Sequence, residues 1–90
     1  MDEQELDLAL EPALDIIDRA TMALQLSRIV NSPVDSVEHA RQAHVAFESA
    51  LFALFALPRV IRTTTAWQHW IEESRHGIAL ASEYLKRHGA

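Results

Sequence analysis

His44 and Glu48 are the residues whose types and spacing come closest to a chemical site. They stand four positions apart in a helix-favouring stretch, so their side chains can meet on one helix face. Such a pair can contribute to a metal site, or act as a base with the carboxylate that orients it. His44 also falls within an apolar stripe of Ala40, Phe47 and Leu51. This position favours a partly buried histidine whose hydrogen bond is made by Glu48. We treat His44 and Glu48, with Arg41 nearby, as a candidate polar site and prefer the structural interpretation.

A second cluster of titratable residues lies near the carboxyl end, at His69, Glu73 and His76. Glu73 and His76 match the E-x-x-H spacing of di-iron bundles, but those bundles draw carboxylates from four helices and this sequence has one such motif. The cluster also points away from the apolar face that holds Trp67 and Ile78. We therefore predict a solvated helix face with ion pairs, no metal centre and no cofactor.

Arg62 and His69 form a third pattern, at the start of a predicted helix. An arginine followed by a histidine after four to six residues resembles the active-site signature of the HEPN ribonucleases. The resemblance covers residues 62–69 and implies an all-helical dimer in which the arginine and histidine of two subunits face one RNA phosphate. The sequence departs from that signature at Thr63, where the family places Asn, Asp or His.

The composition argues against several other classes of function. There is no cysteine, and no glycine-rich phosphate loop or nucleophile elbow occurs in the sequence. The formal net charge of −5 argues against a nucleic-acid-binding protein, and the longest uncharged run, residues 49–58, is too short for a membrane span. The acidic first residues do not resemble a signal peptide. We therefore expect a cytoplasmic protein that binds neither membranes nor nucleic acid, and we favour a non-enzymatic function while keeping an enzyme as the alternative.

The elements that must position these residues are three helices in a single domain covering residues 1–90. Two breaks separate them, at Asn31-Ser32-Pro33 and at residues 58–65. We predict helices over residues 12–30, 34–57 and 65–87, with residues 1–11 forming an acidic strap or a short helix. Pro12 suits a first helical position, Ser32 with Asp35 resembles a capping box, and Thr65 is the expected cap of the last helix. The predicted fold is an all-α, three-helix antiparallel bundle.

The core of this bundle is predicted from apolar residues at helical spacing. The expected core side chains are those of Ile17, Leu24, Phe47, Leu51, Leu54, Trp70 and Ile78. Ser74, Gly77 and Ala81 should leave a shallow groove on the last helix, where a neighbouring element can approach closely.

Two helices carry more apolar surface than a three-helix core needs. The stretch ALFALFALP, residues 50–58, points Phe52, Phe55 and Leu57 away from the core stripe, and the first helix repeats this with Met22, Leu26 and Ile29. In an antiparallel pair these two surpluses lie at opposite ends. Either the apolar residues of the N-terminal segment cover one end, or a partner does. We expect a homodimer that forms a six-helix bundle, with Phe52 and Leu26 more buried in the dimer than in one chain.

These features predict a small acidic helical protein-interaction module. By size and composition it is similar to bacterial and phage regulators, inhibitors and adaptors that act by binding other proteins. The expected partner is a second copy of the chain, with another protein as the alternative. The competing hypothesis is a minimal helical enzyme or metal-binding bundle, using His44 and Glu48, or His69, Glu73 and His76, or a HEPN-like pair of Arg62 and His69.

Overall fold

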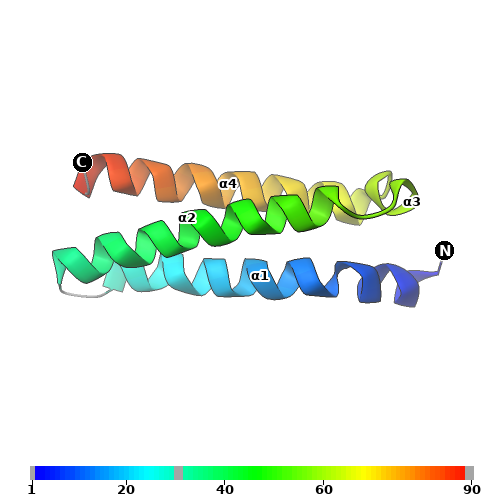
Figure 1. Cartoon of the computed structure of the whole chain (residues 1–90), viewed down its shortest axis with the longest axis horizontal. Coiled ribbons are helices and arrows are strands. Elements are labelled where there is room, and N and C mark those ends of the chain that lie inside the picture. Colours follow the sequence, from blue (N-terminus) through cyan, green and yellow to red (C-terminus); the bar gives the residue numbers. More distant parts are fainter. Residues whose placement is uncertain (1, 30–31, 89–90) are drawn as a thin grey trace.

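The chain folds into long helices that run side by side along an elongated molecule of 47 × 18 × 16 Å (Figure 1). The computed structural model describes residues 2–29 and 32–88, and every regular element in these ranges is a helix. The elements are α1 (Glu3–Ile29), α2 (Pro33–Phe55), the single turn α3 (Arg59–Arg62) and α4 (Thr65–His88). The predicted all-α class is confirmed, with α3 as an additional element. Consecutive long helices run in opposite directions.

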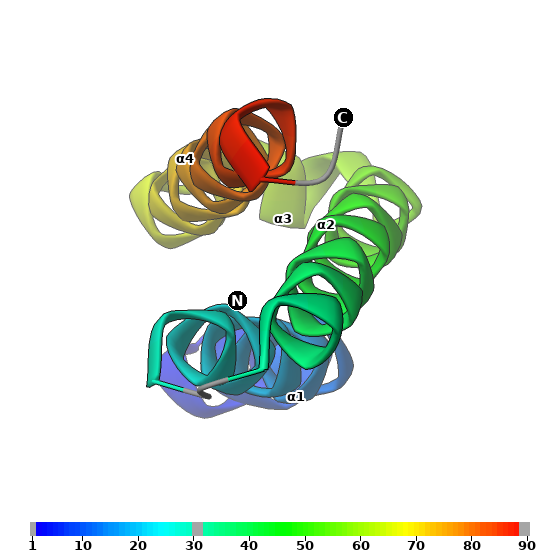
Figure 2. The ribbon, with the colours of Figure 1, turned by 90° about the vertical axis from the view of Figure 1, so that its left-hand side faces the viewer.

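The central element is α2, which packs against both other long helices. Seen along the long axis, α1 and α4 lie on two sides of α2 and have few contacts with each other (Figure 2). Consequently α2 must present buried residues toward two neighbours, whereas α1 and α4 each pack mainly on one.

The first helix begins nine residues earlier than its predicted start, so the expected boundary at Pro12 is wrong. Asp2 caps the helix, because its Oδ1 accepts a hydrogen bond of 2.8 Å from the backbone N–H of Glu5. Pro12 lies inside α1 on its exposed side. A proline there removes one backbone hydrogen bond, and burial of Leu10 in the core helps to offset that loss. The segment 3–11 is therefore part of the long helix. The predicted last residue of this helix, Val30, lies outside the described residues.

The boundaries of α2 and α4 lie within two residues of the predicted ones. Ser32 caps α2, accepting from the backbone N–H of Asp35 at 3.4 Å, as its capping-box pattern predicts. The helix ends at Phe55 instead of residue 57, because Pro58 disfavours the helical conformation of the residue before it. At the start of α4 the cap is Thr64 and not Thr65: its Oγ1 accepts from the backbone N–H of Trp67 at 3.2 Å.

The core is built mainly from small side chains in a regular pattern. The buried residues of α1 and α2 recur in alternating steps of three and four, the spacing of helices that pack side by side with interlocking side chains. Alanine and serine occupy many of these positions, which lets the helices approach closely. The buried residues are Leu10, Ala13, Ile17, Ala20, Leu24 and Ser27 in α1; Ser36, Ala40, Ala43, Phe47, Ala50 and Leu54 in α2; and Ile71, Ser74, Gly77 and Ala81 in α4.

Four of the predicted core residues are buried, namely Ile17, Leu24, Phe47 and Leu54. The other three, Leu51, Trp70 and Ile78, are half-buried and pack at the margin of the core. They contribute to the core from its flanks, because small residues such as Ala50 occupy the centre of the interface. The predicted groove at Gly77 does exist, and the ring of Phe47 fills it.

Candidate protein-binding surface

The outer side of α2 carries large apolar side chains that remain exposed in the described part of the chain. Val34, Val45, Phe52 and Phe55 are all exposed, and Phe52 retains 77% of its accessible surface. They belong to a run of exposed residues in alternating steps of four and three, the same spacing as the buried stripe of this helix. The run forms a second stripe on another side of α2. We call it the α2 outer stripe; its members are Val34, Glu38, Arg41, Val45, Glu48, Phe52 and Phe55.

Next to this stripe runs a shallow groove between α2 and α4. One hollow in it, of about 390 Å³, is lined by His44, Glu48, Leu51, Phe52, Phe55 and Ile78. A second, of about 400 Å³, is lined by Arg41, His44, Val45, Ser82, Leu85 and Lys86. His44 belongs to both, so the two hollows follow one another along the groove. An open apolar groove beside a helix suits the side chains of another helix laid along it.

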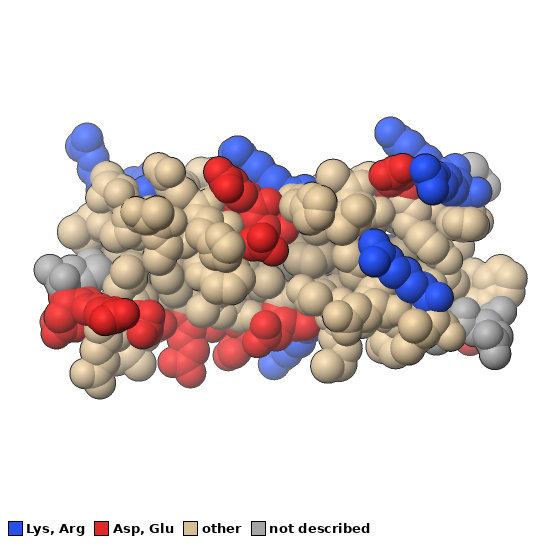
Figure 3. Space-filling model, turned by 180° about the vertical axis from the view of Figure 1, so that it is seen from behind, with Lys and Arg blue, Asp and Glu red and all other residues tan. Residues whose placement is uncertain are grey.

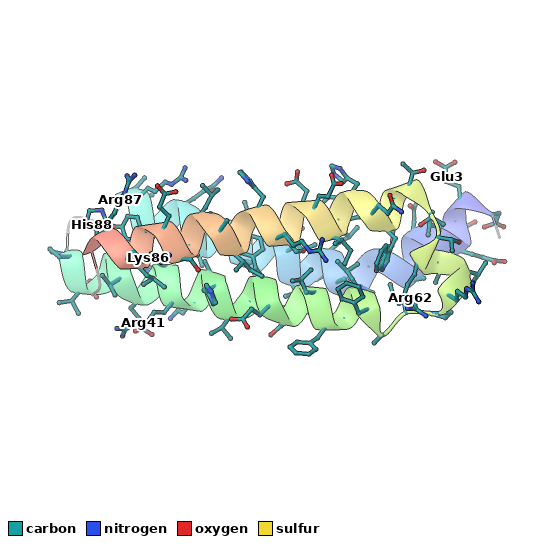
Figure 4. The ribbon with its side chains drawn as sticks, turned by 90° about the horizontal axis from the view of Figure 1, so that it is seen from above. Glu3, Arg41, Arg62, Lys86, Arg87 and His88 are labelled. Carbon is teal, nitrogen blue, oxygen red and sulfur yellow. The ribbon has the colours of Figure 1, made fainter. Side chains whose placement is uncertain are left out.

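The candidate polar site is only partly assembled. His44 Nδ1 lies 2.6 Å from Glu48 Oε1, and His44 is half-buried at the groove while Glu48 stays exposed. Arg41 is exposed and extends outward from α2 (Figure 4), and it makes no ion pair with another described residue. The structure therefore brings together the histidine and the carboxylate but leaves the arginine apart. The pair gives the histidine a hydrogen-bonding partner and sets the polarity of the groove.

The predicted surplus on α1 is also exposed. Met22 and Ile29 are exposed and Leu26 is half-buried. Leu8, two heptads before Met22, is exposed on the same side of the helix. We call Leu8, Met22, Leu26 and Ile29 the α1 outer stripe. Leu10 is buried in the core and Leu6 packs against it, so the N-terminal segment leaves Met22 and Ile29 exposed. Leu57, predicted to be on the surface, packs against the core at the end of α2.

The remaining candidate residues lie on exposed surfaces of α3 and α4. His69, Glu73 and His76 are all exposed, and the His69 ring contacts the ring of Trp70 edge-on with centroids 4.8 Å apart. Arg62 is exposed in α3. Across residues 2–29 and 32–88, no group of three or more His, Asp or Glu side chains is placed to hold a metal ion.

Sequence reasoning missed a buried polar contact at the other end of the bundle. The hydroxyl of Ser36 donates to the backbone carbonyl of Ser27 and accepts from the hydroxyl of Tyr84, which joins α1, α2 and α4. Next to it lies a hollow of about 230 Å³, lined by Leu24, Arg28, Leu80, Glu83, Tyr84, Arg87 and His88. No sequence signal connects these residues, because Ser36 and Tyr84 are far apart in the chain and neither belongs to a motif.

Charge is distributed unevenly over the molecule. Carboxylates line the side formed by α1 (Figure 3), where seven acidic residues lie between Asp2 and Asp18. Basic side chains gather at the end where α4 finishes: Arg41, Lys86, Arg87 and His88 all lie there (Figure 4).

No helix within the described part of the chain has the length and apolar character needed to cross a membrane.

Comparison with known proteins provides no relative from which a function could be transferred. Neither a protein family, nor a curated protein, nor a solved structure matches the chain. The surfaces of the molecule are therefore the basis for inferring its function.

Proposed function

We propose that this protein is a small acidic helical interaction module that works by binding protein partners through the α2 outer stripe. The observation that carries the proposal is the exposure of Phe52, at 77%, together with Phe55 at the edge of an apolar hollow. Exposed large apolar side chains that gather beside an apolar hollow commonly mark protein interfaces. Aromatic side chains are also enriched among the residues that contribute most to binding.

The first partner is a second copy of the chain. Two copies joined through α2 form a six-helix bundle in which α2, already central in one chain, becomes the central helix of the assembly. This arrangement leaves the α1 outer stripe free for a different protein, and that second contact would suit a regulator, inhibitor or adaptor.

Catalysis ranks behind binding because the described side chains supply too few converging groups. His44 and Glu48 are the one histidine–carboxylate pair in direct contact, and their neighbours in the groove are mainly apolar. A minimal enzyme needs a further group that positions or activates a substrate. The HEPN-like alternative needs Arg62 and His69 of two subunits around one phosphate, so it depends on a dimer of a different geometry.

Light scattering coupled to size exclusion at micromolar concentration tests the proposal. We expect a mass near twice the 10.1 kDa of one chain. Phe52→Glu should convert the protein to monomer without loss of helix, because it puts a charge into the apolar contact. Val60→Glu is the matched control, since Val60 is also strongly exposed but lies in α3. A wild-type mass near that of one chain, or a dimer that tolerates Phe52→Glu, would refute the proposed surface.

A further inference from the structure

We infer that two copies of the chain pair antiparallel along the α2 outer stripe, around a two-fold axis that passes beside Val45. In this pairing Arg41 of each copy meets Glu48 of the other. The inference depends on the proposed function, which supplies the surface and the kind of partner, and it adds the register in which the partner binds.

The spacing of the stripe makes such a pairing geometrically regular. A helix packs along another when its contact residues recur in alternating steps of three and four, because each side chain then fills a hole between four residues of its neighbour. The buried stripe of α2 uses this pattern to pack inside the bundle. The α2 outer stripe, from Val34 to Phe55, repeats the pattern with residues that are all exposed among the described residues.

The residue types in the stripe are self-complementary about its middle. With Val45 on the axis, Val45 packs against its own copy, and Arg41 on one side stands opposite Glu48 on the other. One turn further out, Phe52 is opposite Glu38 and enters the hole that Val34 and Val37 help to form. At the ends Val34 faces Phe55. The register therefore covers all four of the exposed large apolar residues of α2: Val34, Val45, Phe52 and Phe55.

Charge complementarity identifies a second copy as the occupant. Under a two-fold axis, a contact between one residue of the first copy and another residue of the second copy occurs twice. Both copies use the same surface, so that surface must be complementary to itself. Arg41 and Glu48 meet this requirement, because they have opposite charge and lie on either side of Val45, four residues before it and three residues after it. A shift by one heptad would instead place like charges near each other at Glu48, which opposes that register.

Both charged groups are available for this contact within one chain. Arg41 extends outward from α2 (Figure 4) and makes no ion pair with another described side chain. Glu48 uses Oε1 to bind His44 at 2.6 Å, which leaves its second oxygen for a guanidinium. His44 thereby holds Glu48 in place at the groove. The pair across the interface is more favourable because one partner is already positioned.

Disulfide cross-linking tests the position of the axis directly, because the chain has no cysteine of its own. Val45→Cys should give a covalent dimer under mild oxidation, since a residue on a two-fold axis lies beside its own copy. Val60→Cys is the matched control: the two valines are 62% and 57% exposed, but Val60 lies in α3, far from the axis. Only Val45→Cys should cross-link, and equal cross-linking of both variants would contradict the register.

A charge exchange tests the contact between Arg41 and Glu48. Arg41→Glu and Glu48→Arg should each weaken the homodimer by about tenfold or more, because each variant brings like charges together twice. Mixing the two variants should restore dimerisation, since all charges at the two contacts are then opposite in the heterodimer. Arg19→Glu and Glu72→Arg, exposed on α1 and α4, form the control pair and should show no preference for mixing.

The outcomes separate this inference from the function it depends on. A wild-type chain that remains monomeric at micromolar concentration overturns both. A dimer that is lost in Phe52→Glu, yet shows no Val45→Cys cross-link and no preference in the mixed charge variants, overturns only the antiparallel register. A selective cross-link together with recovery on mixing establishes it.

Discussion

The ring of Phe47 on α2 occupies the space that a side chain at residue 77 of α4 would need. A Cβ atom built on Gly77 would lie only 2.4 Å from Cζ of Phe47, far closer than atoms in contact normally approach. Phe47 is 3% exposed and belongs to the core, so its ring has little room to move. Gly77 therefore serves the packing of two helices, at the cost of the weaker helix propensity of glycine.

We expect Gly77→Ala to destabilise the fold although alanine favours helices. Overpacking of a core typically costs about 1–3 kcal/mol, and the gain in helix propensity is at most about 1 kcal/mol. The net effect on the free energy of unfolding, measured by urea denaturation, should be a loss. Phe47→Leu in the same background should cost less than in the wild-type protein, because the smaller side chain makes room for the new methyl group. A variant as stable as wild type would show that the ring moves aside at no cost.

Ser36 and Tyr84 should contribute unequally to the polar contact that joins the three long helices. Tyr84→Phe removes one hydroxyl and leaves Ser36 donating to Ser27, so its cost should be about 0.5–1.5 kcal/mol. Ser36→Ala leaves both the Ser27 carbonyl and the Tyr84 hydroxyl without this partner, and should cost about 1–3 kcal/mol. Urea denaturation of the two single variants and the double variant measures the coupling. Equal costs, or additive ones, would argue against a shared contact.

The indole of Trp67 should help to hold the carboxyl end of α2. Its Nε1–H donates to the backbone carbonyl of Leu54 at 2.7 Å, and its ring packs edge-on against Phe55 with centroids 5.3 Å apart. Trp67→Phe removes the donor and should lower the free energy of unfolding by about 0.5–1.5 kcal/mol beyond the effect of the smaller ring. Trp70→Phe is the control, because it makes the same change in ring size without that hydrogen bond. A difference between the two variants close to zero would mean that water replaces the indole.

Local sequence signals predicted the presence of the three long helices and the cap at Ser32, but placed the start of α1 at Pro12 and the cap of α4 one residue late. They predicted the orientation of α2 less well. Large residues such as His44 and Leu51 appeared to mark its inner face, whereas the small residues Ala43 and Ala50 are the ones buried there, together with Phe47 and Leu54. Size is a poor guide here because α2 lies between two helices, and close helix packing selects small side chains at the centre. The start of α1 was missed because the burial of Leu10 depends on tertiary contacts, which a local rule about Pro12 does not include.

The candidate surface was more predictable than the contacts within the bundle. Phe52 and Met22 stand out in the sequence because each breaks the polar pattern expected of an exposed helix face, and both are exposed in the structure. The contact between Ser36 and Tyr84 could not be predicted, since it arises only when the ends of α2 and α4 meet. Which partner covers Phe52 is likewise a property of the assembly and not of one helix.

The α1 outer stripe should be a separate contact from the one made by α2. Met22 and Ile29 lie near the carboxyl end of α1, whereas Phe52 lies near the carboxyl end of α2, and antiparallel packing puts these at opposite ends of the molecule. The two stripes also face different sides, because the groove beside Phe52 is formed with α4, which lies away from α1 (Figure 2). A single flat interface cannot cover both.

We therefore expect Met22→Glu to leave the mass of the wild-type assembly unchanged, in contrast to Phe52→Glu. Met22 is already exposed in one chain, so the new charge stays solvated and the fold should lose less than about 0.5 kcal/mol. Light scattering and urea denaturation on the two variants, side by side, make the comparison. If Met22→Glu is also monomeric while its helix content is retained, α1 belongs to the same interface, and the dimer must be arranged so that Leu26 is buried together with Phe52.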